Sequence, residues 1–299
     1  MIVEDWIKTN TADLNGRVVV MTGAAGGLGS KLSRYLVQLN AKLIMLDRDV
    51  AKMQSLRDEL LKAFPQAVIE MMPTDLNRLS EVHDTAQALL KRRVDYLILN
   101  AGVYNVPLSP GELGYNNVFQ INFISQYYLT KALMPALERT KGKVVATSSI
   151  AYKYATFDEN DWDYTKYTKK NQRVYGNSKR WLMFALSGLF QKPGDVRLAL
   201  VHPGVTLTPM TSHYPKGFNW LVKWTMKIMF PKPEVAALNI LWGVFKDIYP
   251  DQWIGPKQAQ IWGEPAVQSF QPGTEDERRS IFEMAEKIYE VAKKFVKIP

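Results

Sequence analysis

A glycine-rich turn near the start of the chain constrains the fold more than any other feature. The turn is Thr22-Gly23-Ala24-Ala25-Gly26-Gly27-Leu28-Gly29; it follows a β-branched run at 17–21 and precedes a segment at 31–39 with helical apolar spacing. Strand, glycine turn and helix in this order direct free backbone N–H groups and a helix dipole at a dinucleotide pyrophosphate. Glycines let the backbone approach the phosphates closely. The turn therefore predicts a nucleotide-binding α/β domain.

Strand-like and helix-like segments alternate through the first two hundred residues. The predicted strands are residues 17–22, 42–46, 67–71, 95–99, 143–147 and 196–201, and the predicted helices are residues 31–39, 51–63, 78–91, 112–138 and 175–190. This alternation is typical of a Rossmann-type, doubly wound parallel β-sheet with helices on both faces. Ligands of such sheets gather at the carboxyl ends of the strands. We expect a single α/β domain over residues 1–299.

Two segments depart from this alternation, and an extension follows them. A polar, aromatic insertion at 152–174 separates a strand from the next helix, and a long segment at 205–232 contains an apolar run at 218–230. We interpret the first as a substrate-loop insertion, and residues 250–299 as a C-terminal extension. The apolar run is too short and too charged to span a bilayer. It is expected to be a lid over an apolar substrate, with an interfacial helix and core packing as alternatives.

The composition excludes several classes of chemistry. The chain has no cysteine, which rules out disulfides, thiolate metal sites and a cysteine nucleophile. Its three histidines are dispersed, so we expect no metal site. The formal net charge is +9, but the basic residues are spread along the chain, and we expect neither a nucleic-acid partner nor membrane contact. Acidic residues stand where a secretory signal needs basic ones, which predicts a cytoplasmic protein.

The residues suited to chemistry follow the strand at 143–147. This strand ends in Ser148-Ser149, and Tyr175 lies four residues before Lys179, so that both share one helix face. Carbonyl reduction or alcohol oxidation with nicotinamide needs a proton transfer at oxygen. A nearby ammonium favours the phenolate of a tyrosine, whose ordinary pKa is about 10. Tyr175 is thus the candidate acid/base, Lys179 the group that lowers its pKa, and Ser149 the group that orients the substrate, with Ser148 as alternative.

These motifs together resemble the classical short-chain dehydrogenase/reductase family. Gly23, Gly27 and Gly29 fit its T-G-x-x-x-G-x-G turn, although Gly26 also allows the spacing of the extended branch. Leu99-Asn100-Ala101-Gly102 is similar to its N-A-G motif, and Asn122 matches the Asn of its Asn-Ser-Tyr-Lys tetrad. The tail and the interval of 26 residues from Ser149 to Tyr175 resemble, more loosely, the retinol-dehydrogenase-like branch.

The resemblance implies a set of site residues. The catalytic residues would be Asn122, Ser149, Tyr175 and Lys179. The cofactor-binding residues would be Gly23, Gly27, Leu28, Gly29, Asp47, Arg48, Asp75, Leu76, Asn100, Ala101, Gly102, Tyr175, Lys179, Pro203, Val205 and Thr208. Family members commonly pair through the helices that correspond to residues 112–138 and 175–190. The resemblance therefore implies a homodimer or homotetramer, unless the long tail covers that surface.

The cofactor is expected to be NAD. Asp47 follows the second strand, where a carboxylate binds both hydroxyls of the adenine ribose and repels a 2′-phosphate. Arg48 leaves NADP as the alternative, because a guanidinium there can pair with that phosphate. The chain is thus predicted to be an oxidoreductase acting on a small-molecule substrate, a lipophilic secondary alcohol, ketone or aldehyde. The alternative is a catalytically silent NAD(P)-binding sensor on the same fold, for which a filled tetrad has no purpose.

Overall fold

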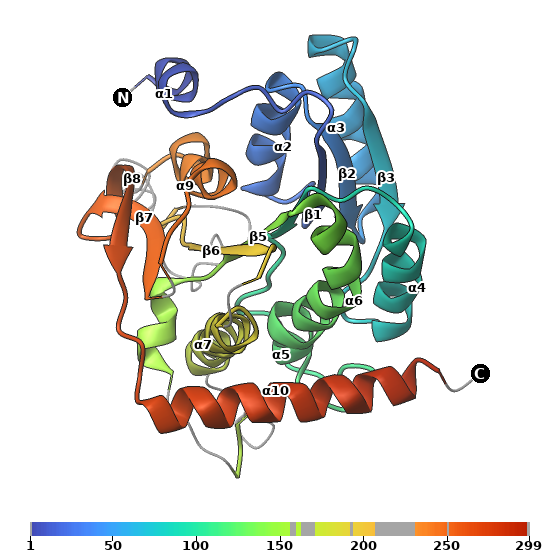
Figure 1. Cartoon of the computed structure of the whole chain (residues 1–299), viewed down its shortest axis with the longest axis vertical. Helices are drawn as coiled ribbons and strands as arrows, with labels where there is room; N and C mark the ends of the chain where they lie inside the picture. Colours follow the sequence, from blue (N-terminus) through green and yellow to red (C-terminus); the bar gives the residue numbers. More distant parts are fainter. Residues whose placement is uncertain are drawn as a thin grey trace, which may run out of the picture.

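The computed structural model describes residues 2–155, 160–162, 171–191, 194–206, 231–249 and 251–297. Within these ranges eight strands form one sheet in the order β3-β2-β1-β4-β5-β6-β7-β8 (Figure 1). The pairs from β3 to β7 are parallel and β8 is antiparallel to β7. The strands are β1 (Val18–Thr22), β2 (Lys42–Asp47), β3 (Ile69–Pro73), β4 (Tyr96–Leu99), β5 (Lys143–Thr147), β6 (Arg197–Val201), β7 (Gln252–Gln258) and β8 (Trp262–Ser269).

Helices cover both faces of the sheet (Figure 1). On one side are α1 (Val3–Asn10), α2 (Gly29–Gln38), α3 (Val50–Ala63) and α9 (Pro233–Phe245). On the other are α4 (Leu79–Leu90), α5 (Asn117–Phe119), η1 (Gln120–Ile124), α6 (Ser125–Thr140), η2 (Ile150–Tyr154), α7 (Asn171–Leu189) and α10 (Glu275–Phe295). Alternate strand residues supply the two cores: Val19 and Met21 face the first layer, and Val20 faces the second. The predicted doubly wound Rossmann-type fold is confirmed.

The predicted strands agree with the observed ones to within two residues at each end, but two predicted helix starts are wrong. Residues 112–116 are not helical: Gly114 has φ +79°, and a bridge joins Pro110 to Asn116. The helical stretch starts only after Asn116, whose side chain accepts a hydrogen bond from the Val118 N–H as an N-cap. Helix α7 begins at Asn171 rather than Tyr175, which places Tyr175 in its second turn.

The carboxyl-terminal fifth of the chain adds α9, the β7–β8 hairpin and α10, and α10 lies against α6 and α7 (Figure 1). Of the predicted substrate-loop insertion, residues 156–159 and 163–170 lie outside the described residues, as do residues 207–230 of the predicted lid. The functions of the insertion, the lid and the extension therefore stay predictions.

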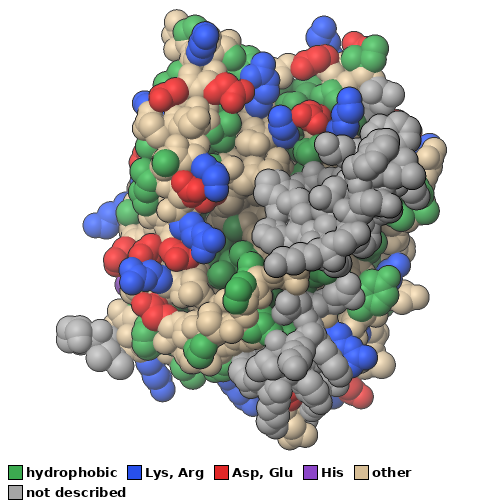
Figure 2. Space-filling view, turned by 180° about the vertical axis from the view of Figure 1, so that it is seen from behind, with side chains coloured by type: hydrophobic (Ala, Val, Ile, Leu, Met, Phe, Trp, Pro, Cys, Tyr) green, Lys and Arg blue, Asp and Glu red, His purple; other side chains and the backbone are tan. Residues whose placement is uncertain are grey.

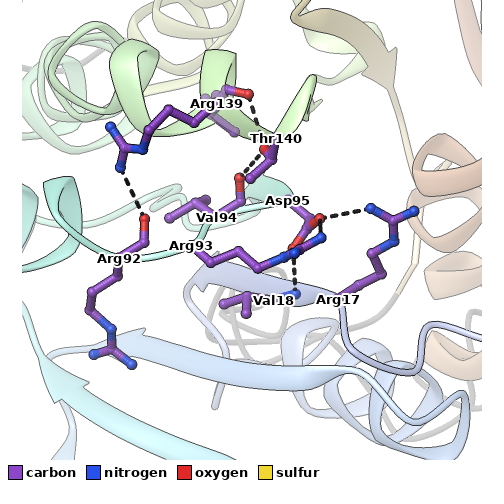
Figure 3. A network of polar contacts seen from close by, with 9 residues as sticks. Arg17, Val18, Arg92, Arg93, Val94, Asp95, Arg139 and Thr140 are labelled. Atoms are coloured by element: carbon purple, nitrogen blue, oxygen red, sulfur yellow. Dashed lines mark hydrogen bonds and ion pairs between the residues drawn. The ribbon is translucent and has the colours of Figure 1, made fainter.

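A buried carboxylate joins the amino ends of β1 and β4 (Figure 3). Asp95 is 3% exposed; it accepts hydrogen bonds from the backbone N–H of Val18 at 2.9 Å, from Arg17 at 2.9 Å and from Arg93 at 2.7 Å. Two guanidinium partners compensate for the burial of its charge. These contacts fix β1 against β4 at their amino ends, opposite to the carboxyl ends of the strands.

On the face seen in Figure 2, Lys and Arg side chains are interspersed with Asp and Glu side chains. On this face, therefore, the basic side chains do not form a separate patch but alternate with acidic ones. No helix within the described ranges is long and apolar enough to cross a bilayer.

Candidate active site

A cavity of about 840 Å³ opens at the carboxyl ends of the parallel strands, where the fold predicts a ligand. Nearly all predicted site residues line it. They are Gly23, Gly27, Leu28, Gly29, Asp47, Arg48, Asp75, Leu76, Asn100, Ala101, Gly102, Ser149, Tyr175, Lys179, Pro203 and Val205. Asn122 lies behind the wall instead, and Thr208 lies outside the described residues.

The glycine turn is packed too tightly for side chains at two positions. A Cβ on Gly29 would lie 2.0 Å from the carbonyl oxygen of Gly23, so α2 can begin there only with glycine. Gly23 has φ +65°, and a Cβ there would lie 2.8 Å from the Cα of Ala101. Gly26 donates its N–H to the Gly23 carbonyl at 3.1 Å. The backbone of the turn is therefore held close to the start of α2.

Carboxylates and cations line the end of the cavity beside β2. Asp47 accepts hydrogen bonds from the backbone N–H groups of Ala25 and Asp49, both at 3.2 Å, which fixes its carboxylate against the glycine turn. Arg48 is exposed, and the neighbouring Lys52 pairs with Asp49 at 2.7 Å. The hydrogen bonds of Lys52 lower the pKa of the Asp49 carboxyl. Asp49 and Lys52 also line the cavity, and the sequence analysis did not identify them.

Asn100 joins β1 to β4 directly under the cavity. Its side-chain amide donates to the carbonyl oxygens of Thr22 at 3.2 Å and Gly23 at 3.1 Å. The Thr22 hydroxyl in turn accepts from the N–H groups of Asn100 and Ala101, both at 3.1 Å. This reciprocal arrangement fixes the loop after β4 against the glycine turn.

Ser149, Tyr175 and Lys179 meet at the other end of the cavity. Ser149 is the N-cap of η2, where its hydroxyl accepts from the Ala151 N–H at 3.2 Å, and its side chain also hydrogen bonds to Tyr175. Lys179 lies one turn after Tyr175, with Nζ 6.0 Å from the tyrosine ring centre, and donates to the Thr147 carbonyl at 2.8 Å. The structure thus brings Ser149, rather than Ser148, into contact with Tyr175.

Burial perturbs the titration of both helix residues. It raises the pKa of Tyr175 to about 12, an effect that the hydrogen bond with Ser149 opposes and the neighbouring Tyr104 reinforces. Burial lowers the pKa of Lys179 to about 8. The pKa of Tyr175 is therefore raised in this structure, opposite to the lowering expected from Lys179. A lowering by Lys179 stays a prediction.

Asn122 lies beside the cavity without lining it. It lies in the π-helical turn η1, a helix type that occurs often at functional sites. Its side-chain oxygen accepts from the Val103 N–H at 2.8 Å, and its amide donates to the Val103 carbonyl and the Ser178 hydroxyl, both at 3.0 Å. Asn122 therefore connects the loop after β4 to α7 beside Lys179.

The turn after β6 forms the remaining wall. Gly204 has φ +82°, and its N–H donates to Nδ1 of the fully buried His202 at 3.1 Å. A Cβ on Gly204 would lie 2.8 Å from the side chain of Pro256 in β7. The histidine and the hairpin together hold Pro203 and Val205 at the cavity.

The sequence did not predict several residues of the cavity lining, among them Tyr104, Ile150 and Tyr154. The rings of Tyr104 and Tyr175 meet edge to face with centres 5.1 Å apart. Tyr104 lies in the loop after β4, and Ile150 and Tyr154 lie in the short turn η2, so none of them belongs to an element long enough to give a periodic signal. Their position shortly after Asn100 and Ser149 is the only hint that the sequence contains.

The cavity fits a nicotinamide dinucleotide. Its volume lies within the roughly 300–1,000 Å³ typical of cofactor sites. The hydroxyls of Thr147 and Ser148 line it and are buried without a hydrogen-bond partner, as expected where a polar ligand binds. Within the ranges described, no group of three or more His, Cys, Asp or Glu side chains is placed to hold a metal ion.

Comparison with known proteins agrees with this arrangement. The family model described as short chain dehydrogenase matches residues 17–217. An uncharacterized oxidoreductase of Schizosaccharomyces pombe is 28% identical over 79% of this chain and 74% of its own length. Retinol dehydrogenase 14 of Mus musculus is 31% identical over 67% of this chain and 64% of its own length.

Solved structures share the fold. An uncharacterized protein from Mycobacterium Paratuberculosis superposes with a TM-score of 0.76 at 22% identity, over 94% of this chain and 96% of its own. A metagenomic short-chain oxidoreductase in complex with NADP superposes with a TM-score of 0.56 at 24% identity, over 79% of this chain and 95% of its own.

Proposed function

The chain belongs to the short-chain dehydrogenase family, and from this premise we propose that it is an NAD(P)-dependent oxidoreductase. Its substrate would be a lipophilic secondary alcohol, ketone or aldehyde. The observation that carries the proposal is the contact between Ser149 and Tyr175 at one end of the cavity, with Lys179 one helical turn away.

A bound nicotinamide supplies the hydride for reduction or accepts it in oxidation. The chain's own residues handle the proton. In the reducing direction Tyr175 donates its phenolic proton to the substrate oxygen, and in the oxidising direction it takes the proton of the alcohol. Ser149 donates a hydrogen bond to the same oxygen and keeps it next to Tyr175. The ammonium of Lys179 stabilises the phenolate that remains, and Asn122 keeps the α7 face aligned with the loop after β4.

The dinucleotide would extend from the β2 edge to Tyr175. The glycine turn and the amino end of α2 would bind the pyrophosphate. Asp47 and Asp75 would bind the adenosine, and Pro203 and Val205 would contact the nicotinamide. We favour NAD because the carboxylate of Asp47 is fixed at the cavity wall. NADP is the alternative, supported by Arg48 and by the solved relative that binds NADP.

The described lining near Tyr175 supports a lipophilic substrate. Val103, Tyr104, Ile150 and Tyr154 present apolar or aromatic surface, while the acidic side chains of the lining lie at the β2 end. An apolar, uncharged substrate would match this surface, because burying a charge without a partner is costly.

A catalytically silent sensor is the second candidate, and the geometry favours the enzyme. A sensor needs the glycine turn and Asp47 but has no use for a tyrosine that is hydrogen bonded to a serine inside the cavity.

The first experiment that separates the two candidates is a titration of the protein with NADH and NADPH, followed by nicotinamide fluorescence. A screen of alcohols and ketones with the tighter cofactor follows. Binding with turnover supports the enzyme, binding without turnover the sensor, and binding of neither cofactor refutes both.

A further inference from the structure

The connection after β8 and the first turn of α10, together residues 270–277, contact both elements that carry the proposed catalytic residues. We call these residues the C-terminal strap. In Figure 1 it leads from the hairpin to α10, which packs against α7. Tyr152 of η2 and Arg180 of α7 hydrogen bond to the strap.

Tyr152 connects the strap to the turn of Ser149. The side chain of Tyr152 is fully buried, and its hydroxyl accepts from the Gln271 N–H at 3.0 Å. Its ring packs against Trp253 and Phe270, with centres 5.4 and 6.3 Å away. At the other end, the Tyr152 N–H donates to the Ser149 carbonyl at 3.1 Å. Tyr152 therefore bonds to the strap through its hydroxyl and to Ser149 through its backbone N–H.

Arg180 connects the strap to α7, the helix that carries Tyr175 and Lys179. It follows Lys179 directly, and its guanidinium binds Glu277 through two bonds, Nε to Oε1 at 2.6 Å and Nη2 to Oε2 at 2.5 Å. The two side chains are only 14% and 13% exposed. Nη1 of Arg180 also donates to the Tyr152 carbonyl at 3.4 Å. A bidentate pair shielded from water fixes geometry far better than an exposed pair.

The surrounding backbone leaves little freedom for these contacts. Gly273 has φ +71°, and a Cβ there would lie 2.6 Å from Oε2 of Glu277 and 3.0 Å from Nη2 of Arg180. The Thr274 hydroxyl caps α10 by accepting from the Glu277 N–H at 3.1 Å. A Cβ on Gly176 would lie 2.4 Å from the Ala151 carbonyl, so α7 and η2 touch through their backbones. A shift of η2 along α7 would therefore move Ser149 relative to Tyr175 directly.

We propose that Arg180 and Glu277 are positioning residues, which hold Ser149 against Tyr175 by clamping η2 to α7 through the C-terminal strap. The inference rests on the proposed function, because it assigns these residues to the same reaction. Neither residue lines the cavity. They would therefore affect the proton-transfer geometry without contributing to cofactor affinity.

The test compares Glu277→Gln and Arg180→Lys with Glu290→Gln. The control breaks an ion pair with Lys293 on the same helix, which is exposed and remote from the strap. For the first two variants we expect kcat to fall about tenfold while the Kd for NADH stays within about twofold, since a misplacement of ~1 Å can reduce the rate about a hundredfold. The control should leave both unchanged. The exchange pair Arg180→Glu with Glu277→Arg should restore part of kcat.

Hydrogen–deuterium exchange of residues 149–155 provides a readout that needs no turnover. Exchange in this segment should accelerate in Glu277→Gln and Arg180→Lys but not in Glu290→Gln. Unchanged exchange, or a loss of thermal stability with an unchanged kcat, would overturn the proposal. If the wild-type chain shows no turnover, the proposed function fails, and the exchange result still decides whether the strap holds η2.

Discussion

His202 should make the stability of this protein depend on pH well above the range where carboxylates titrate. Its ring is fully buried, stacked on Trp253 with centres 4.4 Å apart, and Nδ1 accepts the Gly204 N–H. A Cβ on Gly255 would lie 2.4 Å from the ring, so its pocket is closely filled. Burial, with a smaller contribution from the charge of Lys153, lowers the pKa of His202 to about 3.

The sign of the effect follows from the two pKa values. Between an unfolded value of about 6.5 and the folded value of about 3, the unfolded chain binds a proton that the folded protein excludes. The free energy of unfolding should therefore decrease as the pH falls below about 6.5, by about 1.4 kcal/mol per pH unit. From pH 7 to pH 5 this amounts to about 2 kcal/mol.

Urea denaturation of wild type and His202→Gln at pH 7, 6 and 5 measures this contribution. The variant should be less stable at pH 7, because it loses the ring stack with Trp253. Its loss of stability between pH 7 and pH 5 should be smaller than that of wild type by about 2 kcal/mol. Carboxylates contribute equally to both proteins, so the difference isolates His202. Equal losses in the two proteins would show that His202 does not cause the pH dependence.

Three further predictions concern the site and its surroundings. Gly29→Ala should weaken NADH binding at least tenfold, since the added Cβ would lie 2.0 Å from the carbonyl oxygen of Gly23. Fluorescence titration with NADH measures the affinity, and an unchanged affinity would contradict this prediction. Asp47→Ser should weaken NADH binding and strengthen NADPH binding, and so shift the ratio of the two Kd values about tenfold. The control Asp49→Asn should change this ratio less. An unchanged ratio in Asp47→Ser would favour Arg48 as the residue that selects between the two cofactors. Helix α10 occupies part of the face formed by α6 and α7, so we expect a monomer in sedimentation velocity, and a dimer that persists with α10 in place would contradict this.

Strands β1 to β6 were predictable because each of them is a short apolar run bounded by turns. The glycine turn, Asn100 and the Tyr175–Lys179 pair also have local patterns, and the cavity unites them. The sequence left Ser148 and Ser149 as alternatives, because both end the same strand. Their difference depends on the N-cap geometry of η2, which brings Ser149 to Tyr175.

The carboxyl-terminal elements were not predicted, for identifiable reasons. Helix α9 is buried on nearly all sides, so it has no polar face to give a helical period. Strands β7 and β8 contain Pro256 and Pro265, which normally argue against a strand and are tolerated in this two-stranded edge. The contacts of Arg180 with Glu277 join residues 97 positions apart, and no local pattern indicates such a pair.

The central claim is that Tyr175 transfers the proton during nicotinamide-dependent chemistry. The most direct test measures turnover and NADH affinity of Tyr175→Phe beside wild type, with the substrate found in the screen. We expect turnover to fall by about a hundredfold to ten-thousandfold while the Kd for NADH changes by less than about threefold, since only the hydroxyl is lost. Turnover comparable to that of wild type would contradict the claim.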